Sequence, residues 1–135
     1  MKTSVTPVSL LAGLALALPL LASAAHPVQD SYRTQARQDN PAFKDFSAAA
    51  GQKLYTTQGA EWSCASCHTD SPLAAGKHAK TNQAILPLAP AANPTRFSDA
   101  AKVEKWFKRN CNDVLKRACS AQEKGDFMAY VLSVK

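Results

Sequence analysis

Cys64-Ala65-Ser66-Cys67-His68, near the middle of the 135-residue chain, is the most informative motif of the sequence. Two cysteines separated by two residues and followed directly by a histidine form the C-x-x-C-H pattern of covalent haem attachment, in which two thiols add to the two vinyl groups of the porphyrin. The adjacent histidine can then ligate the iron. The pattern predicts one covalently bound haem c, with its iron, attached through Cys64 and Cys67 and ligated first by His68.

The same pattern has two other interpretations, a redox-active dithiol of the thioredoxin kind and one half of a zinc site. The dithiol occurs in a βαβ context, and the surrounding sequence shows no such alternation of strands and helices. A structural zinc site needs a second pair of ligands with similar spacing, and the sequence has no such pair. We therefore favour haem.

The N-terminal sequence determines how the cysteines are interpreted. Lys2 precedes an apolar run from Leu10 to Leu21, and small residues follow the run. This arrangement is typical of a secretory signal peptide, and the run is shorter than the roughly 20 residues that span a bilayer. We expect residues 1–25 to be a signal peptide, cleaved after Ala24 or Ala25, which exports the protein to the periplasm without stable membrane insertion. Thiols in that compartment end in disulfides or bound cofactors.

Composition bounds the size of the domain and the character of its surface. The chain carries 16 Lys and Arg residues against 10 Asp and Glu residues, a formal net charge of +6. The basic residues between Lys102 and Arg117 are dispersed among apolar ones and form no dense stripe, so we expect no nucleic-acid binding. A chain of this length forms one small domain, whose modest core benefits from an additional stabilising element such as a covalent cofactor.

The first helix is predicted after a short polar segment. Residues 26–39 are polar and are expected to form a loosely ordered N-terminal extension. Asn40 is the expected N-cap and Pro41 the first helical residue, because Asn is favoured at N-caps and Pro at the first helical position. Apolar residues then repeat at helical spacing, namely Phe43, Phe46, Ala50 and Leu54.

Two further helices are predicted in the C-terminal third of the chain. One begins after Ser98 as N-cap and ends at about Cys111, and the residues on its inner face are Val103, Trp106, Phe107 and Asn110. The other begins after Ser120, which forms a capping box with Glu123. Its apolar side carries Phe127, Tyr130 or Val131, and Val134. The middle of the chain is too interrupted for regular structure, because it contains Pro72, Pro87, Pro90 and Pro94.

A helix, the C-x-x-C-H motif, a proline-rich loop and a terminal aromatic helix, in that order, resemble a class I cytochrome c. The resemblance implies an all-α fold over residues 40–135, with the first and last helices crossing beside a covalently bound haem. In that family a small residue and an aromatic residue of the first helix meet an aromatic residue of the last. Here Gly51, Leu54 and Tyr55 would contact Phe127 and Tyr130.

The second iron ligand is not obvious, because a class I cytochrome normally supplies a methionine. After signal cleavage only Met128 remains, and it lies inside the predicted terminal helix, where we expect it to fill the core. The other candidates are His78, Lys77, Lys80 and Asn110. Asn110 is unusual on the inner face of a helix, because a buried amide without partners costs about 1 to 3 kcal/mol. It is therefore hydrogen-bonded, capping the helix end or bound to a ligand.

The C-terminal half resembles the SHP-type cytochromes c, high-spin relatives of the class I proteins whose ferric iron carries an asparagine side chain. The similarity covers the chain from about Gly51 onward, except for residues 69–86, which match poorly. It implies Asn110 as the sixth ligand and a disulfide between Cys111 and Cys119. The segments that carry the resemblance are Leu88-Ala89-Pro90, Arg96-Phe97, Val103-Glu104-Lys105-Trp106 and Arg109-Asn110-Cys111-Asn112, followed by Cys119.

The implied disulfide restricts the second helix. Eight residues of continuous helix would separate Cys111 from Cys119 by about 12 Å, because a helix rises roughly 1.5 Å per residue. A disulfide requires Cα atoms within about 7 Å of each other. The helix must therefore end soon after Cys111, and the chain must turn back before Ser120.

The resemblance also implies a function. An amide oxygen suits ferric iron and should leave ferrous iron, which opens a site for a diatomic ligand such as oxygen or nitric oxide. Electrons would come from a redox partner, which the family implies is a dihaem cytochrome c, docked on the basic residues from Lys102 to Arg117. The alternatives are a plain electron carrier with a strong sixth ligand, and a haem enzyme that reduces oxygen or peroxide with His78 as its acid-base residue.

Overall fold

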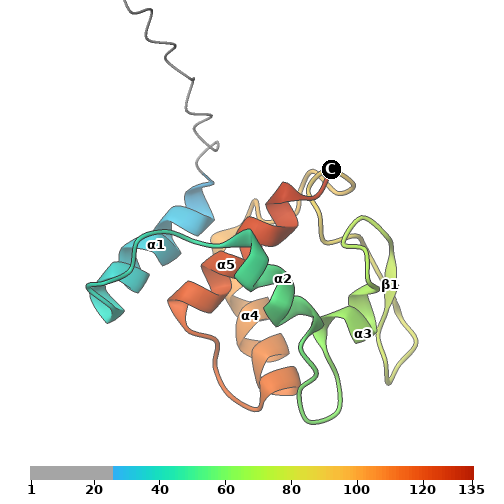
Figure 1. Ribbon diagram of the computed structural model, residues 1–135. Helices are drawn as coiled ribbons and strands as arrows, with labels where there is room; N and C mark the ends of the chain where they lie inside the picture. The colour runs from blue at the N-terminus through green and yellow to red at the C-terminus, as the bar shows by residue number, and fades with distance from the viewer. Residues whose placement is uncertain (1–25) are drawn as a thin grey trace, which may run out of the picture.

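The computed structural model describes residues 26–135 and folds this part of the chain into five helices and one short β-hairpin (Figure 1). The predicted signal peptide lies outside the described residues. Within them no helix is both long and apolar enough to cross a membrane. The elements in chain order are α1 (Pro27–Asp39), α2 (Ala48–Thr56), α3 (Cys64–His68), β1 (Gly76–Lys77), β2 (Ala84–Ile85), α4 (Ala100–Leu115) and α5 (Ala121–Ser133).

The segment 26–39 is a helix, so the expectation of a loosely ordered extension is wrong. Pro27 lies in its first turn, where proline fits because that turn needs no backbone donor. Three apolar side chains spaced four residues apart then form a narrow buried stripe, which packs on α5 (Figure 1): Val28, Tyr32 and Ala36. The burial of this stripe orders a segment whose mean composition is polar.

The start of the next helix was also predicted wrongly. Asn40 is the C-cap of α1, and its side-chain oxygen accepts a hydrogen bond from the amide of Ala42 at 3.0 Å. Asn forms such local turns as readily as it caps helices, so the same residue type fits both predictions. Helix α2 begins at Ala48, after Ser47, whose side chain caps the amide of Ala50.

The two C-terminal helices are close to prediction. Helix α4 begins after Asp99 rather than Ser98, and it runs four residues beyond Cys111 to Leu115. Lys116, in the left-handed conformation, ends it. The capping box at the start of α5 is confirmed, because the side chains of Ser120 and Glu123 each bond the other's backbone amide.

Helices α2 and α5 pack directly against each other, as Figure 1 shows for the green and red helices. Gly51 makes this approach possible, because a Cβ at that position would collide with the backbone carbonyl of Asp126. The ring of Tyr55 lies 6.1 Å from that of Phe127 and 5.5 Å from that of Tyr130, measured between centroids. The predicted all-α fold with crossing helices is therefore confirmed.

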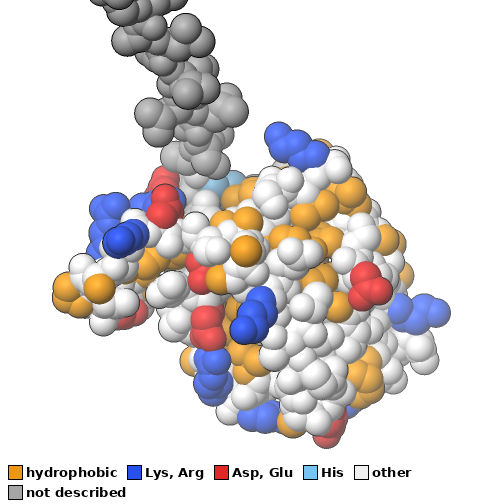
Figure 2. Space-filling model, in the orientation of Figure 1, with side chains coloured by type: hydrophobic (Ala, Val, Ile, Leu, Met, Phe, Trp, Pro, Cys, Tyr) orange, Lys and Arg blue, Asp and Glu red, His pale blue; other side chains and the backbone are white. Residues whose placement is uncertain are grey.

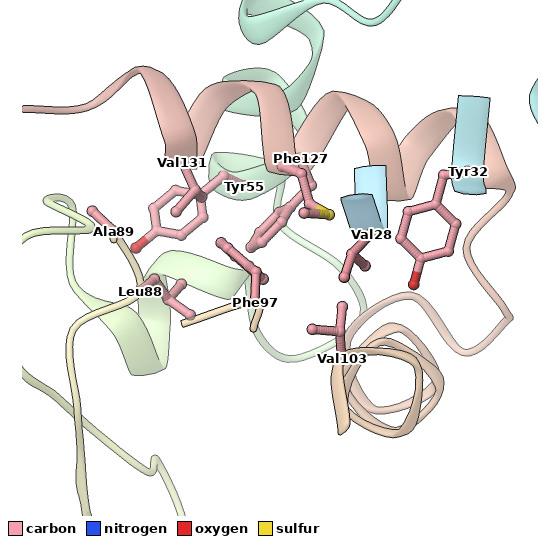
Figure 3. Packing of buried hydrophobic residues seen from close by; sticks show 10 residues of the cluster. Val28, Tyr32, Tyr55, Leu88, Ala89, Phe97, Val103, Phe127 and Val131 are labelled. Carbon is pink, nitrogen blue, oxygen red and sulfur yellow. The ribbon is translucent and has the colours of Figure 1, made fainter. Parts of the chain in front are cut away.

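The core lies between these helices and the proline-rich loop. Met128 is completely buried in it, which confirms the prediction that this methionine fills the core. Figure 3 shows the side chains that converge from α1, α2, α5, the start of α4 and the loop. The buried cluster consists of Val28, Tyr32, Tyr55, Leu88, Ala89, Phe97, Val103, Phe127, Met128 and Val131.

The loop between α3 and α4 is irregular, as predicted, apart from the pairing of β1 with β2. The register of this antiparallel pair places Gly76 opposite Ile85. Farther along, the carbonyl oxygen of Pro72 accepts hydrogen bonds from the amides of Leu88 and Ala89, at 3.0 and 2.9 Å. These bonds close the part of the loop between Pro72 and Leu88, which contains the hairpin, and the hairpin lies beside α3.

Candidate haem site

The C-x-x-C-H motif occupies the single helical turn α3. Ser63 caps this turn in a reciprocal pair with Ser66, since each side chain bonds the other residue's backbone amide. Within one turn Cys64, Cys67 and His68 are three and four residues apart, so the three side chains share one face of the helix. The local capping thus presents both thiols and the imidazole in the same direction.

These three side chains line a cavity of about 620 Å³. Its volume falls within the range of about 300 to 1,000 Å³ that is usual for cofactor and ligand sites. Asn110 of α4 lines it as well, so the cavity unites every residue that the sequence predicts to hold the haem. Its apolar walls come from many elements, and include Leu54, Trp62, Ile85, Leu86, Leu88, Phe97, Val103, Trp106, Phe107, Val114 and Phe127.

Two of the wall residues indicate that the cavity suits a large planar apolar group. Leu86 is 69% exposed and Trp106 is 42% exposed, and they are the large hydrophobic side chains most exposed to solvent among residues 26–135. Both line this cavity. A porphyrin held by the neighbouring cysteines would cover them, so their exposure and the donor set fit the same group.

The imidazole of His68 is neutral at physiological pH. Burial, and secondarily the positive charge of Arg96, lower the pKa of His68 to about 4. Neutral imidazole is the form that ligates iron. Arg96 is itself held by the loop, because its guanidinium donates to the carbonyl oxygens of Leu86 at 2.8 Å and Pro87 at 2.9 Å.

The backbone after His68 is strained and is held by a buried phenol. Thr69 has φ 63° and ψ 173°, a region that β-branched residues rarely adopt. The hydroxyl of Tyr55 donates to the carbonyl oxygens of His68 at 3.1 Å and of Thr69 at 2.5 Å. Tyr55 is fully buried in the contact between α2 and α5. The helix pair that forms the core therefore also supports the backbone of the histidine.

Asn110 lies in the interior of α4, five residues before its last residue. The interpretation of Asn110 as a helix cap is therefore wrong, because the αL residue Lys116 ends the helix instead. The amide of Asn110 makes no side-chain hydrogen bond with residues 26–135, although the side chain is only partly exposed and lines the cavity. A partly buried amide without a protein partner is available to a ligand.

Cys111 and Cys119 form a disulfide, as the resemblance implies. Their Cα atoms are 5.7 Å apart. This distance is reached because α4 ends at Leu115 and the chain reverses before Ser120, as the spacing of the cysteines requires. The bridge follows Asn110 directly in sequence and lines the same cavity, so it ties the end of α4 to the start of α5 beside the site.

The remaining ligand candidates lie on the hairpin. Lys80 and His78 line the cavity, whereas Lys77 does not. The Nδ1 atom of His78 accepts hydrogen bonds from the amides of Lys80 and Thr81, at 3.3 and 3.2 Å. Nδ1 therefore carries no proton, and the neutral ring is protonated on Nε2. An imidazole that ligates through Nε2 needs the opposite tautomer, which opposes ligation by His78.

The described residues offer little support for a site in which side chains alone bind a metal ion. No group of three or more His, Cys, Asp and Glu side chains between residues 26 and 135 lies close enough to hold a metal ion. Burial, followed by the proximity of Cys67, raises the pKa of the Cys64 thiol to about 11. The Cys64 side chain is thus a neutral thiol at physiological pH.

Sequence reasoning missed several wall residues. Trp62 stands two residues before Cys64, and Ile85 and Leu86 lie on the hairpin, in the segment that matched poorly. The available signal was a large apolar side chain in a polar, turn-rich loop, which suggests contact with something other than the protein core. The role of the Tyr55 hydroxyl was missed too, because Tyr55 was considered only for the packing of its ring.

Comparison with known proteins identifies relatives that bind haem. Residues 41–131 match a family model described as a domain of unknown function, DUF1924. Cytochrome c'' of Methylophilus methylotrophus is 42% identical over 107 residues, which cover 76% of this chain and 74% of that protein. The cytochrome c-type protein SHP of Cereibacter sphaeroides is 48% identical over 69 residues, which cover 51% of this chain and 53% of that protein.

Solved structures of the same relatives share the fold. Oxidised cytochrome c'' aligns with a TM-score of 0.74 at 38% identity, covering 81% of this chain and 93% of that one. A solution structure of cytochrome c'', described as giving insights into haem-ligand detachment, aligns with a TM-score of 0.71 at 38% identity, covering 79% and 90%. Oxidised SHP, described as an oxygen-binding cytochrome c, aligns with a TM-score of 0.69 at 34% identity, covering 78% and 92%.

The family match, the relatives and the cavity around the C-x-x-C-H motif all lead to the same class of protein. Cytochrome c'' exceeds 40% identity over three quarters of the chain, and both relatives share the fold with high structural similarity. The chain belongs to the DUF1924 family and is an SHP-type cytochrome c with one covalently bound haem.

Proposed function

We propose that this protein is an exported monohaem cytochrome that accepts an electron and then binds a small diatomic ligand. Cys64 and Cys67 would attach the haem, His68 would ligate the iron on one side, and Asn110 would be a weak ligand on the other. The observation that carries the proposal is the single cavity lined by all four side chains. The haem, when bound, supplies a one-electron redox centre and a coordination position for a ligand.

Asn110 is the residue that would make ligand binding depend on the redox state. Its amide oxygen is a hard, weak donor, which binds ferric iron better than the softer ferrous iron. His68 would stay bound in both states, because the bonds from Tyr55 support its backbone. Reduction would therefore release Asn110 and leave His68 in position, which opens one face only.

The ligands that we propose are oxygen and nitric oxide. SHP is described as an oxygen-binding cytochrome c, and the solution structure of cytochrome c'' is described in terms of haem-ligand detachment. Phe107 and Val114, one helical turn before and after Asn110 in α4, line the same cavity. Such walls suit a small uncharged ligand, which needs little hydrogen bonding.

The electron donor that we propose is another cytochrome, of the dihaem c type, docked on α4. Six basic residues on α4 and the turn after it are exposed, and three of them also line the cavity. Arg109 is paired with Asp113 and Arg117 with Glu123, whereas the other four are not ion-paired within residues 26–135. The six are Lys102, Lys105, Lys108, Arg109, Lys116 and Arg117. On the face seen in Figure 2, blue side chains are scattered. An acidic partner would be steered to α4 by charge, and its binding would weaken with salt.

Export to the periplasm is part of the same proposal. Haem attachment and the disulfide between Cys111 and Cys119 both suit an oxidising extracytoplasmic compartment. N-terminal sequencing of protein from a periplasmic extract tests it, and we expect the mature chain to begin at Ala25 or His26. A mature chain that begins at Met1 and remains in the cytoplasm would contradict the proposal.

Absorption spectra of haem-loaded wild type, Asn110→Ala and Asn112→Ala, in both oxidation states, test the role of Asn110. Asn112 is a matched control, because it is an exposed asparagine of the same helix that does not line the cavity. We expect high-spin ferric bands in the wild type, altered ferric bands and faster nitric oxide binding in Asn110→Ala, and no change in Asn112→Ala. Low-spin ferric bands, or equal spectra and kinetics for all three proteins, would instead indicate a plain electron carrier.

A further inference from the structure

Helix α1 is tied to α4 and α5 by one polar cluster. The hydroxyl of Tyr32 on α1 donates to Oε2 of Glu104 on α4 at 2.8 Å. Lys124 of α5 donates from Nζ to both carboxylate oxygens of Glu104, at 2.7 and 2.9 Å, and the same Nζ lies 5.2 Å from the centre of the Tyr32 ring. Three helices therefore meet at one carboxylate.

The cluster is continuous with the packing that reaches the haem cavity. The Tyr32 ring meets the ring of Phe107 edge to face at 5.8 Å, and Phe107 meets Phe127 in the same way at 5.5 Å. Both phenylalanines line the cavity. Figure 3 shows the hydroxyl of Tyr32 pointing towards the helix that carries Val103, which is α4. Tyr32 is 5% exposed whereas the side chain of Glu104 is 52% exposed, so the ring is buried and the carboxylate lies at the surface.

Asn110 lies between this cluster and the disulfide. Glu104 precedes it by six residues and Cys111 follows it directly. Much of the inner face of α4 borders the cavity, so these two attachments act beside the core packing of Val103 and Phe107 in holding α4 to the rest of the described chain. The disulfide restrains the C-terminal end of α4, and the cluster around Glu104 restrains the N-terminal half.

We infer that α1 is a strap whose Tyr32 hydroxyl, bonded to Glu104, holds α4 in the position from which Asn110 reaches the haem iron. Tyr32 and Glu104 are thus positioning residues for the release and return of the sixth ligand. The inference rests on the proposed role of Asn110. With the strap intact, α4 is preorganised, so Asn110 rebinds without an additional entropic cost. With the strap broken, Asn110 competes less well against an added ligand.

The test uses cyanide binding to the ferric, haem-loaded protein, because cyanide binds only after Asn110 leaves. Tyr32→Phe keeps the ring and removes the donor, and Glu104→Ala removes the acceptor. We expect either change to raise the rate of cyanide association by about three- to tenfold. This is less than the full effect of losing a hydrogen bond to a charged group, because only part of that loss is transmitted to Asn110. Glu104→Gln, which keeps an acceptor for the hydroxyl, should stay closer to wild type.

Ser31→Ala is the matched control, because Ser31 precedes Tyr32 in α1 and its hydroxyl bonds only within that helix, to the carbonyl of Val28. The double variant Tyr32→Phe/Glu104→Ala should bind cyanide no faster than the faster single variant, since both changes break the same contact. Wild-type rates for Tyr32→Phe, or equal effects of Tyr32→Phe and Ser31→Ala, would overturn the inference.

Hydrogen exchange separates a failure of the strap from a failure of the proposed ligand. Tyr32→Phe should speed exchange of the backbone amides of α4 whether or not Asn110 binds iron. If Asn110→Ala leaves cyanide binding unchanged, the proposed ligand is wrong. If exchange in α4 is the same in wild type and Tyr32→Phe, α1 is not a strap.

Discussion

The hydroxyl of Tyr55 shares its one proton between the backbone carbonyl oxygen of His68, at 3.1 Å, and that of Thr69, at 2.5 Å. One fully buried side chain thus links the contact between α2 and α5 to the proposed iron ligand. It also stabilises a strained residue, because Thr69 has φ 63°. Tyr55 is not among the cavity walls, so it acts on His68 through the backbone.

We predict that Tyr55→Phe lowers the free energy of unfolding by about 0.5 to 1.5 kcal/mol, because the partly buried carbonyls of His68 and Thr69 lose their hydrogen-bond donor. It should also shift the iron–histidine stretching frequency of the ferrous protein, measured by resonance Raman spectroscopy. Tyr130→Phe is the control, since the Tyr130 ring packs on Tyr55 at 5.5 Å while its hydroxyl is not hydrogen-bonded within residues 26–135. If the two variants have the same frequency, Tyr55 does not position His68.

The part of the fold that was predicted correctly is the part coded by short stretches of sequence. The motif at Cys64 and the capping box at Ser120 each involve residues within four positions, so local chemistry determines them. Asn40 was misread because its residue type serves both a helix N-cap and a local turn, and only tertiary packing decides between the two. Helix α1 was missed because its stripe of three apolar residues matters only once α5 lies against it.

The candidate site was predictable to a similar degree. The motif and the resemblance to a known family gave the residues that point at the cofactor, and the structure brings them into one cavity. The contacts that support these residues could not be predicted from the sequence, because they join residues that are distant along the chain. The hydroxyl of Tyr55 reaches the backbone thirteen residues later, and that of Tyr32 reaches Glu104 seventy-two residues later. No local pattern encodes such pairs.

Removal of the disulfide should affect both stability and ligand exchange. We predict that Cys111→Ser/Cys119→Ser lowers the free energy of unfolding by roughly 2 to 3 kcal/mol, the chain-entropy value for so short a loop. It should also speed cyanide binding to the ferric protein, because Cys111 follows Asn110 directly in α4. Chemical denaturation and stopped-flow mixing measure the two effects. Slower or unchanged binding would show that the bridge does not restrain Asn110.

His78 should prove dispensable for the iron. Its Nδ1 accepts two backbone hydrogen bonds, which fixes the tautomer that cannot ligate through Nε2. We predict that His78→Ala leaves the ferric and ferrous absorption spectra unchanged and lowers only the stability of the hairpin. His78→Asn, whose side-chain oxygen can accept the same bonds, should restore that stability. A ferric spectrum altered by His78→Ala would make His78 a ligand after all.

Acid should weaken the contact between Arg117 and Glu123. The hydrogen bond from Arg117 is the main cause of the low pKa of Glu123, which lies below its usual value of 4.5 despite partial burial. The folded state thus favours the charged form, so this stabilisation is present above pH 4.5 and is lost as the pH falls through the lowered pKa. Burial raises the pKa of Asp126, so the folded state favours the protonated form of this residue and its protonation in acid stabilises the fold.

We therefore predict that Glu123→Gln makes the free energy of unfolding less dependent on pH below about 4.5, because glutamine keeps the capping box without the charge. Denaturation at several pH values measures this dependence. Asp39→Asn, at the exposed end of α1, is the control. Its free energy of unfolding should depend on pH with the same slope as that of the wild type. An equal loss of slope in both variants would assign the effect to net charge rather than to the contact with Arg117.

The closeness of α2 and α5 makes Gly51 sensitive to substitution. On an open helix face, replacing glycine by alanine stabilises a helix by about 1 kcal/mol. At Gly51 the new Cβ would collide with the backbone of Asp126, which cannot move without shifting α5. We predict that Gly51→Ala lowers the free energy of unfolding by about 1 to 3 kcal/mol, the usual cost of overpacking.

Gly125→Ala provides the comparison, measured by the same denaturation of the haem-loaded protein. There the new Cβ would meet only the ring of Phe46, a side chain that is partly exposed and can turn away. Gly125→Ala should therefore cost less than Gly51→Ala, although both glycines lie in helices. The reverse order would mean that α5 adjusts more easily than the Phe46 ring, and that the crossing of α2 and α5 does not depend on a glycine.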